Sequence, residues 1–139
     1  MKVKVRLLFA VVACMAVTPV ANADNIYVSL VHANQIEKFT AGGFGSVFAT
    51  NLNGPEGLAF DAAGNLFVSD LVDRAIYKVA PDSSKTTFAS GLRGPVGMKF
   101  DKSGNLFVAD YPNVLKFTPD GARSIFATGI IPFDLAFRP

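Results

Sequence analysis

The sequence has one cysteine and one histidine, and both shortages restrict the chemistry that the chain can perform. Cys14 is the only cysteine, so no disulfide can form within the chain and packing must hold the fold together. His32 is the only histidine, so a histidine triad for a metal is excluded within one chain, and no repeat unit shows a nucleophile and an orienting partner for a Ser-His-Asp arrangement. We therefore expect His32 to be an ordinary loop residue.

Charge is sparse and balanced beyond the first residues. Three of the 13 Lys and Arg residues lie before Ala23, where there is no Asp or Glu, so the rest of the chain carries nearly equal numbers of both signs. No basic run remains there, and without a basic patch we expect no nucleic-acid partner. No stretch keeps the 3.6-residue apolar period of an amphipathic helix, so we expect no helices.

Residues 1–23 have the composition of a secretory signal peptide. A positively charged start, MKVKVR, precedes the apolar run LLFAVVACMAV, and the small residues Ala21 and Ala23 follow. We predict cleavage after Ala23, which places the remaining chain outside the cell or in the periplasm. The apolar run is shorter than the roughly 20 residues of a membrane helix, so no membrane span is expected. The alternative is a lipoprotein processed at Cys14, although the apolar run before this residue is short for that.

The remaining chain repeats with a period of 40 residues. Asn25, Asn65 and Asn105 open three similar strands, and GNLFVSD at 64–70 returns as GNLFVAD at 104–110. Each unit holds four short apolar runs that are separated by Gly, Pro, Asp, Asn or Ser, a pattern that predicts four strands joined by turns. In the middle unit these strands are expected near 57–60, 65–69, 75–80 and 86–90, with equivalents one period either way.

The link FDAAGN predicts a tight turn between the first two strands of a unit. The carboxylate of Asp61 can accept a hydrogen bond from the backbone two residues further on, and Gly64 tolerates positive φ. Four antiparallel strands per unit of about 40 residues are typical of a β-propeller blade. We therefore predict an all-β fold, a β-propeller of four-stranded antiparallel blades, that spans residues 24–139.

The segment GPEGLAFDAAGNLFVSD at 54–70, with its repeat at 94–110, resembles the NHL-repeat propellers. It is equally similar to the gluconolactonase and regucalcin-like propellers and to the streptogramin lyases. The resemblance covers essentially the whole repeat region and implies the propeller architecture. It does not imply one activity, because these motifs are structural and a fold hosts many functions.

The strands suffice for about three blades, whereas propellers close with about four to eight. The repeat begins on the second strand of a blade at 25–29, and we expect 133–137 to be the first strand of another, which makes twelve strands with the last one completing the first sheet. Three alternatives follow. The sequence is a piece of a longer propeller, or two copies complete a ring of six blades, or the chain forms an open arc with exposed apolar blade faces.

The resemblance implies a candidate metal site. In the resembled lactonases a divalent ion lies at the mouth of the central channel, held by Glu, Asn and Asp side chains near the entry to the innermost strands. The matching positions here are Glu56, Val96 and Phe133, so Glu56 alone can bind a cation such as calcium, which needs six to eight oxygen ligands. Asp134 lies one residue further along and is expected to point the other way. The alternative for Glu56 is a solvated residue at the channel mouth.

Asp70 and Asp110 are the other candidate binding residues, because they end equivalent strands at the loop-bearing end of the blades. In NHL-type repeats such an Asp usually braces the following loop by accepting hydrogen bonds from backbone N–H groups. Direct contact with a ligand is the alternative role. The third unit has Leu30 at this position.

Two classes of function remain. The first is a secreted or periplasmic binding module that contacts a protein or an extended ligand across its loop-bearing face, or that self-associates to complete a ring. The second is a metal-dependent lactonase-like hydrolase or a streptogramin-type lyase that needs further blades. The sequence leaves open whether the protein is an enzyme.

Overall fold

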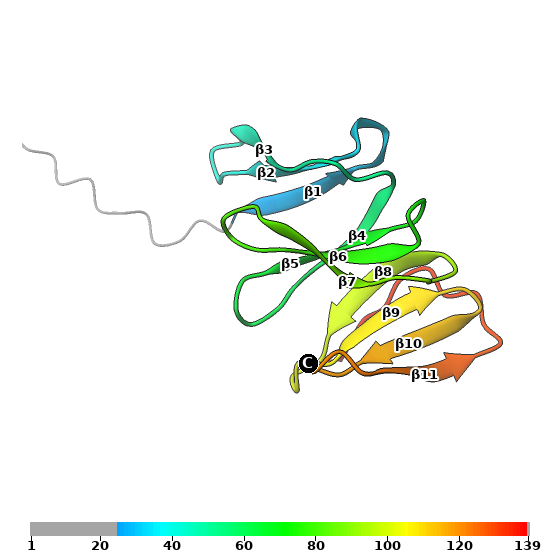
Figure 1. The fold of residues 1–139 in the computed structure, drawn as a ribbon. Coiled ribbons are helices and arrows are strands. Elements are labelled where there is room, and N and C mark those ends of the chain that lie inside the picture. The colour runs from blue at the N-terminus through cyan, green and yellow to red at the C-terminus, as the bar shows by residue number, and fades with distance from the viewer. Residues whose placement is uncertain (1–24, 139) are drawn as a thin grey trace, which may run out of the picture.

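The computed structural model describes residues 25–138, which form three antiparallel β-sheets in chain order (Figure 1). Blade 1 has the strands β1 (Ile26–Leu30), β2 (Gln35–Phe39) and β3 (Gly45–Ala49). Blade 2 has the strands β4 (Pro55–Phe60), β5 (Leu66–Asp70), β6 (Ala75–Val79) and β7 (Lys85–Ala89). Blade 3 has the strands β8 (Pro95–Phe100), β9 (Leu106–Asp110), β10 (Asn113–Phe117) and β11 (Arg123–Thr128). The predicted all-β fold of antiparallel blades is confirmed, with four strands in blades 2 and 3 and three in blade 1.

Each blade is a meander in which neighbouring strands are consecutive in the sequence. The FDAAGN turn has the expected geometry: Asp61 Oδ1 accepts hydrogen bonds from the N–H of Ala63 at 3.0 Å and of Asn65 at 2.8 Å, and Gly64 has φ of +82°. Asp101 repeats these bonds in blade 3. The only helical segment within residues 25–138 is the three-residue 3-10 turn Val31–Ala33, where His32 lies exposed as expected for a loop residue.

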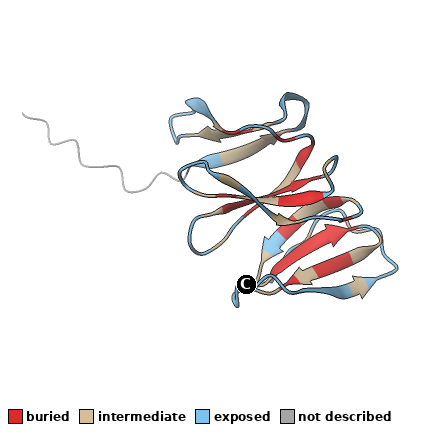
Figure 2. Ribbon diagram, viewed as in Figure 1, coloured by how far each residue is buried: buried red, intermediate tan, exposed pale blue. Residues whose placement is uncertain are grey.

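The hydrophobic core lies between successive blades rather than within one sheet (Figure 2). Between blades 1 and 2 it contains Ile36, Ala49, Leu52, Leu66, Val68 and Val79. Between blades 2 and 3 it contains Ala59, Phe67, Ile76, Leu92, Met98, Leu106, Val108, Leu115 and Phe117. β5 and β9 are buried along their full length, β5 between two neighbouring blades and β9 between blade 2 and the segment 131–138, where Phe107 contacts Phe137. Burial on both faces explains their continuous apolar runs.

Aromatic rings join the blades at equivalent positions. Phe67 of β5 contacts Phe100 of the next blade edge to face, with 5.0 Å between ring centroids, and Tyr27 of β1 contacts Phe60 in the same way at 4.8 Å. Edge-to-face pairs of this kind add about 0.5–1.5 kcal/mol to the burial of apolar area. The repeat of phenylalanine in the sequence is therefore a repeat of contacts between blades.

The prediction of a twelfth strand at 133–137 is wrong. Residues 131–138 form no strand, and the first blade is a three-stranded sheet without an inner strand. The segment instead runs beside blade 3, where Phe137 contacts Phe107 with 5.2 Å between ring centroids. It is not paired with β1, so the ends of the repeat region do not share one sheet. A strand is completed by hydrogen bonds to the edge of another strand, and within residues 25–138 no such bonds join the two ends of the repeat region. The three sheets therefore form an open arc.

The predicted signal peptide and its cleavage after Ala23 lie outside the described residues, as does Cys14. Among residues 25–138, no helix has the length and hydrophobicity needed to cross a bilayer.

Candidate functional site

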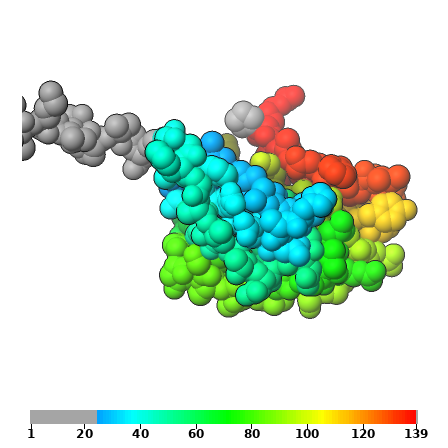
Figure 3. Space-filling model, turned by 90° about the horizontal axis from the view of Figure 1, so that it is seen from above, coloured from blue at the N-terminus to red at the C-terminus, as the bar shows by residue number. Residues whose placement is uncertain are grey.

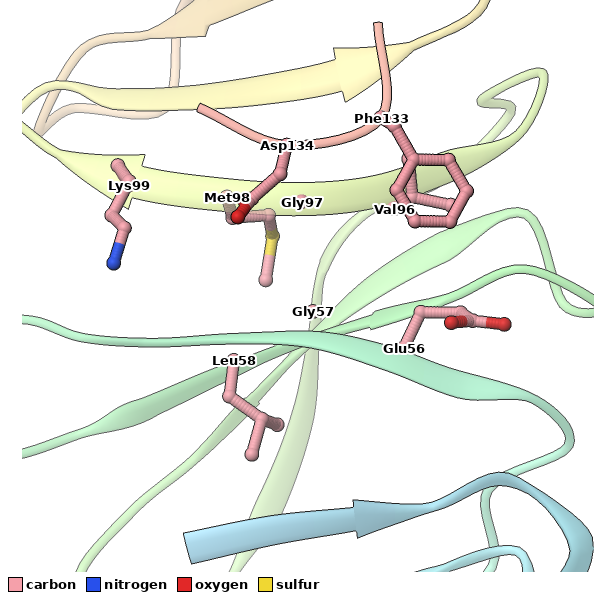
Figure 4. A pocket seen from close by; sticks show the side chains of 9 residues that line it. All are labelled: Glu56, Gly57, Leu58, Val96, Gly97, Met98, Lys99, Phe133 and Asp134. Carbon is pink, nitrogen blue, oxygen red and sulfur yellow. The ribbon is translucent and has the colours of Figure 1, made fainter. Parts of the chain in front are cut away.

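The inner strands of blades 2 and 3 and the segment 131–138 enclose a cavity of about 320 Å³ (Figure 4). In a propeller, inner strands surround the central channel, and the cavity corresponds to the part of that channel that one chain provides. Its lining residues come from three equivalent positions of the repeat, and they are Glu56, Gly57, Leu58, Val96, Gly97, Met98, Lys99, Phe133 and Asp134.

Blades 2 and 3 approach closely at the cavity through a serine and a glycine. Ser69 Oγ accepts a hydrogen bond from the N–H of Gly57 at 2.8 Å and donates one to the carbonyl oxygen of Val96 at 2.7 Å. A Cβ atom on Gly57 would lie 2.2 Å from that carbonyl oxygen, so this position requires glycine. Ser29 Oγ makes the equivalent bond from blade 1, to the carbonyl oxygen of Glu56 at 2.8 Å.

Blade 3 holds the segment 131–138 without a serine. Ala109 occupies the position of Ser69, and the N–H of Gly97 instead donates directly to the carbonyl oxygen of Phe133 at 3.0 Å. A Cβ atom on Gly97 would lie 2.6 Å from Cα of Asp134. The segment therefore takes the place, relative to blade 3, that β8 takes relative to blade 2.

The charged groups of the cavity do not gather at one point. Glu56 and Lys99 lie at opposite ends in Figure 4, and the carboxylate of Asp134 lies at the level of Gly97 and Met98. Within residues 25–138 no group of three or more His, Cys, Asp or Glu side chains could hold a metal ion. A calcium site needs six to eight oxygen ligands, and the assignment of Glu56 as a metal ligand stays a prediction.

Asp70 and Asp110 are buried at the ends of β5 and β9 and accept hydrogen bonds from backbone N–H groups. Asp70 accepts from Asn53 at 2.7 Å and from Asp73 at 3.0 Å, so it fastens the loop before β4 as well as the loop that follows β5. Asp110 accepts from the N–H of Arg93 at 2.8 Å and from the N–H of Gly94 at 2.6 Å. For Asp110 the braced loop precedes the inner strand, which differs from the expected loop that follows. Ligand contact by either residue stays a prediction.

A group of hydrogen-bonded side chains around Asp73, beside Asp70, is not predicted from the sequence. Asp73 accepts from Asn53 Nδ2 at 2.6 Å and from the hydroxyl of Tyr77 at 2.7 Å. The hydrogen bonds from the Asn53 side chain and then from Tyr77 lower the pKa of Asp73, and the bond to Asp73, with burial and the nearby carboxylates, raises the pKa of Tyr77 to about 12. No sequence signal pairs these residues, because Asn53 lies 20 positions before Asp73.

No protein-family model and no curated protein sequence matches the chain. Among solved structures, a chain of a nidogen/laminin complex is 26% identical over 84% of this chain and 49% of its own length, with a TM-score of 0.77. Virginiamycin B lyase from Staphylococcus aureus is 18% identical over 79% of this chain and 41% of its own, with a TM-score of 0.69. A gluconolactonase from Xanthomonas campestris is 18% identical over 76% and 44%, with a TM-score of 0.70.

This chain spans less than half the length of each of these proteins. They include a lyase and a lactonase as well as a chain from a protein complex, so the likeness concerns the fold. Regucalcin from Agrobacterium tumefaciens also matches, at a TM-score of 0.61. The residues that the structure describes are therefore three blades of a β-propeller that resembles the streptogramin-type lyase, gluconolactonase, regucalcin and nidogen propellers.

Proposed function

We propose that the protein is a secreted or periplasmic propeller that binds a protein or an extended ligand across the end of the blades that carries the loops after β1, β5 and β9. This end, the loop face, is held together by backbone bonds between neighbouring loops. The N–H of Leu52 donates to Asn34 O at 3.4 Å, and that of Leu71, in the loop after β5, donates to Gly54 O at 2.9 Å in the connection from blade 1 to blade 2. The loops therefore form one continuous surface.

The observation that carries the proposal is a set of exposed large apolar side chains on the loop face. We call this set the apolar row, and it consists of Val31, Leu71, Val72 and Tyr111. The side chains recur at the same loops of successive blades, where the packing of one blade on the next does not cover them. Exposed apolar groups that are gathered in this way mark interaction surfaces.

The proposal is tested with peptides selected from a random library for binding to the purified protein. We expect the selected peptides to contain apolar residues and to bind at least about tenfold more weakly to the Val72→Asp and Tyr111→Asp variants, since each charge would be desolvated at the contact. Val47→Asp is the matched control, because Val47 is 55% exposed, against 67% for Val72, but lies on the outermost strand of blade 1. Equal affinities for all variants would contradict the proposal.

The second candidate is a metal-dependent lactonase-like hydrolase or a streptogramin-type lyase that is completed by further blades. It is favoured by the position of Glu56 at the channel cavity and by the likeness to proteins with these activities. A metal ion that binds only the folded state must raise the melting temperature. This candidate requires a rise with calcium, magnesium or manganese that Glu56→Gln removes and that Asp82→Asn, on an exposed turn, preserves.

A further inference from the structure

The strand β1 has a free edge that its counterparts lack. β5 is paired with β4 on one side and β6 on the other, and β9 is paired with β8 and β10. Among residues 25–138, β1 is paired only with β2. An unpaired edge presents a row of N–H and C=O groups that can bind another strand.

The segment 131–138 is the complementary element, because it already has the position of an inner strand and is paired with no strand in the part of the chain that the structure describes. Phe137 contacts Phe107 as Phe100 contacts Phe67, with centroid distances of 5.2 and 5.0 Å. Gly97 holds the segment at Phe133 through the backbone. Its side chains form the red part of the surface in Figure 3. The segment is thus placed where the first strand of a fourth blade would lie.

The two elements match in register. β4 and β5 pair through Pro55 with Asp70 and Phe60 with Leu66, and β8 and β9 pair through the equivalent residues. When the same register is applied to the free elements, four pairs result: Pro132 with Leu30, Leu135 with Val28, Ala136 with Tyr27, and Phe137 with Ile26.

We propose that two copies of this chain close a six-bladed ring about a twofold axis, in which each copy adds residues 131–138 to β1 of the other. One chain offers both elements once, so two copies satisfy both free edges in a closed, symmetric contact. Closure of residues 25–138 on themselves would make a ring of three blades, below the four to eight of known propellers. A second copy is therefore the partner that fits both ends of the arc.

The apolar faces at the two ends of the arc also match. Ile26 of blade 1 is 62% exposed, whereas its equivalents Leu66 and Leu106 are 0% and 1% exposed because a preceding blade covers them. At the other end, Phe126 of blade 3 is 65% exposed, whereas its equivalent Phe88 packs on Phe117 at 5.4 Å. In the ring, Phe126 would pack in the same way on Phe39 of the second copy.

One charged side chain lies on the face of blade 1 that the second copy would cover. Glu37 occupies the position of Leu115 in blade 3 and accepts a hydrogen bond from Gln35 Nε2 at 3.0 Å. The ring also completes the channel, since it brings Glu56 and Asp134 of both copies around one axis. The channel site is therefore incomplete in a single copy.

The first test measures the native mass of the full purified chain by light scattering over a range of concentrations. We expect twice the mass that is found under denaturing conditions. Ile26→Lys should raise the dissociation constant at least about 30-fold, because the charge would be buried at the centre of the contact. Thr87→Lys, at an exposed position of the middle blade, should leave the constant unchanged, and Glu37→Leu should lower it. A monomer at all concentrations, or equal dissociation constants for Ile26→Lys and Thr87→Lys, would overturn the proposal.

The second test identifies the contact by disulfide formation in a Cys14→Ser background. A chain with Val28→Cys is mixed with a chain that carries Leu135→Cys, and we expect a disulfide-linked dimer under oxidation. Either chain alone should give none, because twofold symmetry keeps identical positions apart. A chain with both substitutions that forms its disulfide within a monomer would overturn the proposal in favour of self-closure. Binding of selected peptides to the apolar row is measured separately, so failure of the ring and failure of the proposed function are distinguishable.

Discussion

The hydroxyl of Ser69 donates a hydrogen bond at 2.7 Å to the carbonyl oxygen of Val96, on the inner strand of the next blade. Ser69 Oγ also accepts a hydrogen bond from the N–H of Gly57 at 2.8 Å, so one buried side chain satisfies two strands from two blades. The bonds that line the channel are therefore also bonds that hold the blades together.

Ser69→Ala should lower the free energy of unfolding by about 1–3 kcal/mol, because it leaves a buried N–H and a buried carbonyl without their partner. Chemical denaturation of the purified protein measures this loss. Ser103→Ala is the control, since Ser103 is exposed on a turn. Equal stability of the two variants would show that the bonds of Ser69 contribute nothing.

Gly57→Ala should be more damaging than a glycine substitution elsewhere in the same repeat. The added Cβ would meet the main chain of the next blade at 2.2 Å, and backbone cannot move aside as a flexible side chain can. Overpacking of this kind costs about 1–3 kcal/mol or more. At the equivalent of Gly54 in blade 3, Gly94→Ala meets only the side chain of Leu71 at 3.5 Å and should be tolerated. A comparison of melting temperatures decides between these outcomes.

Asp110→Asn should destabilise the fold rather than weaken binding alone. Asp110 is buried and accepts two backbone N–H groups through one oxygen, and a hydrogen bond to a charged group contributes about 1.5–3 kcal/mol. Asp82→Asn, at an exposed turn, is the control. If Asp110→Asn kept its stability and lost binding to selected peptides, the residue would be a ligand contact and not a brace.

Tyr77 should ionise near pH 12, and Asp73→Asn should move this step toward the ordinary tyrosine value of about 10. A pKa that is raised in the folded state adds stability below the unfolded pKa, and this stability is lost as pH rises from about 10 through 12. Absorbance of tyrosinate follows the ionisation, and unfolding curves at several alkaline pH values follow the stability. An unchanged titration in Asp73→Asn would show that the hydrogen bond to Tyr77 is not formed in solution.

The strands and turns could be predicted because their causes are local. The FDAAGN turn needs only Asp61 and Gly64, which are three residues apart, and the apolar runs of β5 and β9 follow from burial on both faces. The sequence predicts that Asp70 and Asp110 hold a loop through backbone N–H groups, but it identifies only some of the loops that they hold in the structure. The bond from Ser69 to Val96 was not foreseen, because nothing local links residues 27 positions apart.

The repeat, the all-β class and the position of each strand that has its partner beside it in the chain follow from the sequence alone. The conformation of residues 131–138 depends on the tertiary structure, because this segment has the sequence of an inner strand and forms none. A strand is completed only by hydrogen bonds to a second segment. The sequence can favour an extended segment, but the arrangement of the blades determines whether a partner strand lies next to it.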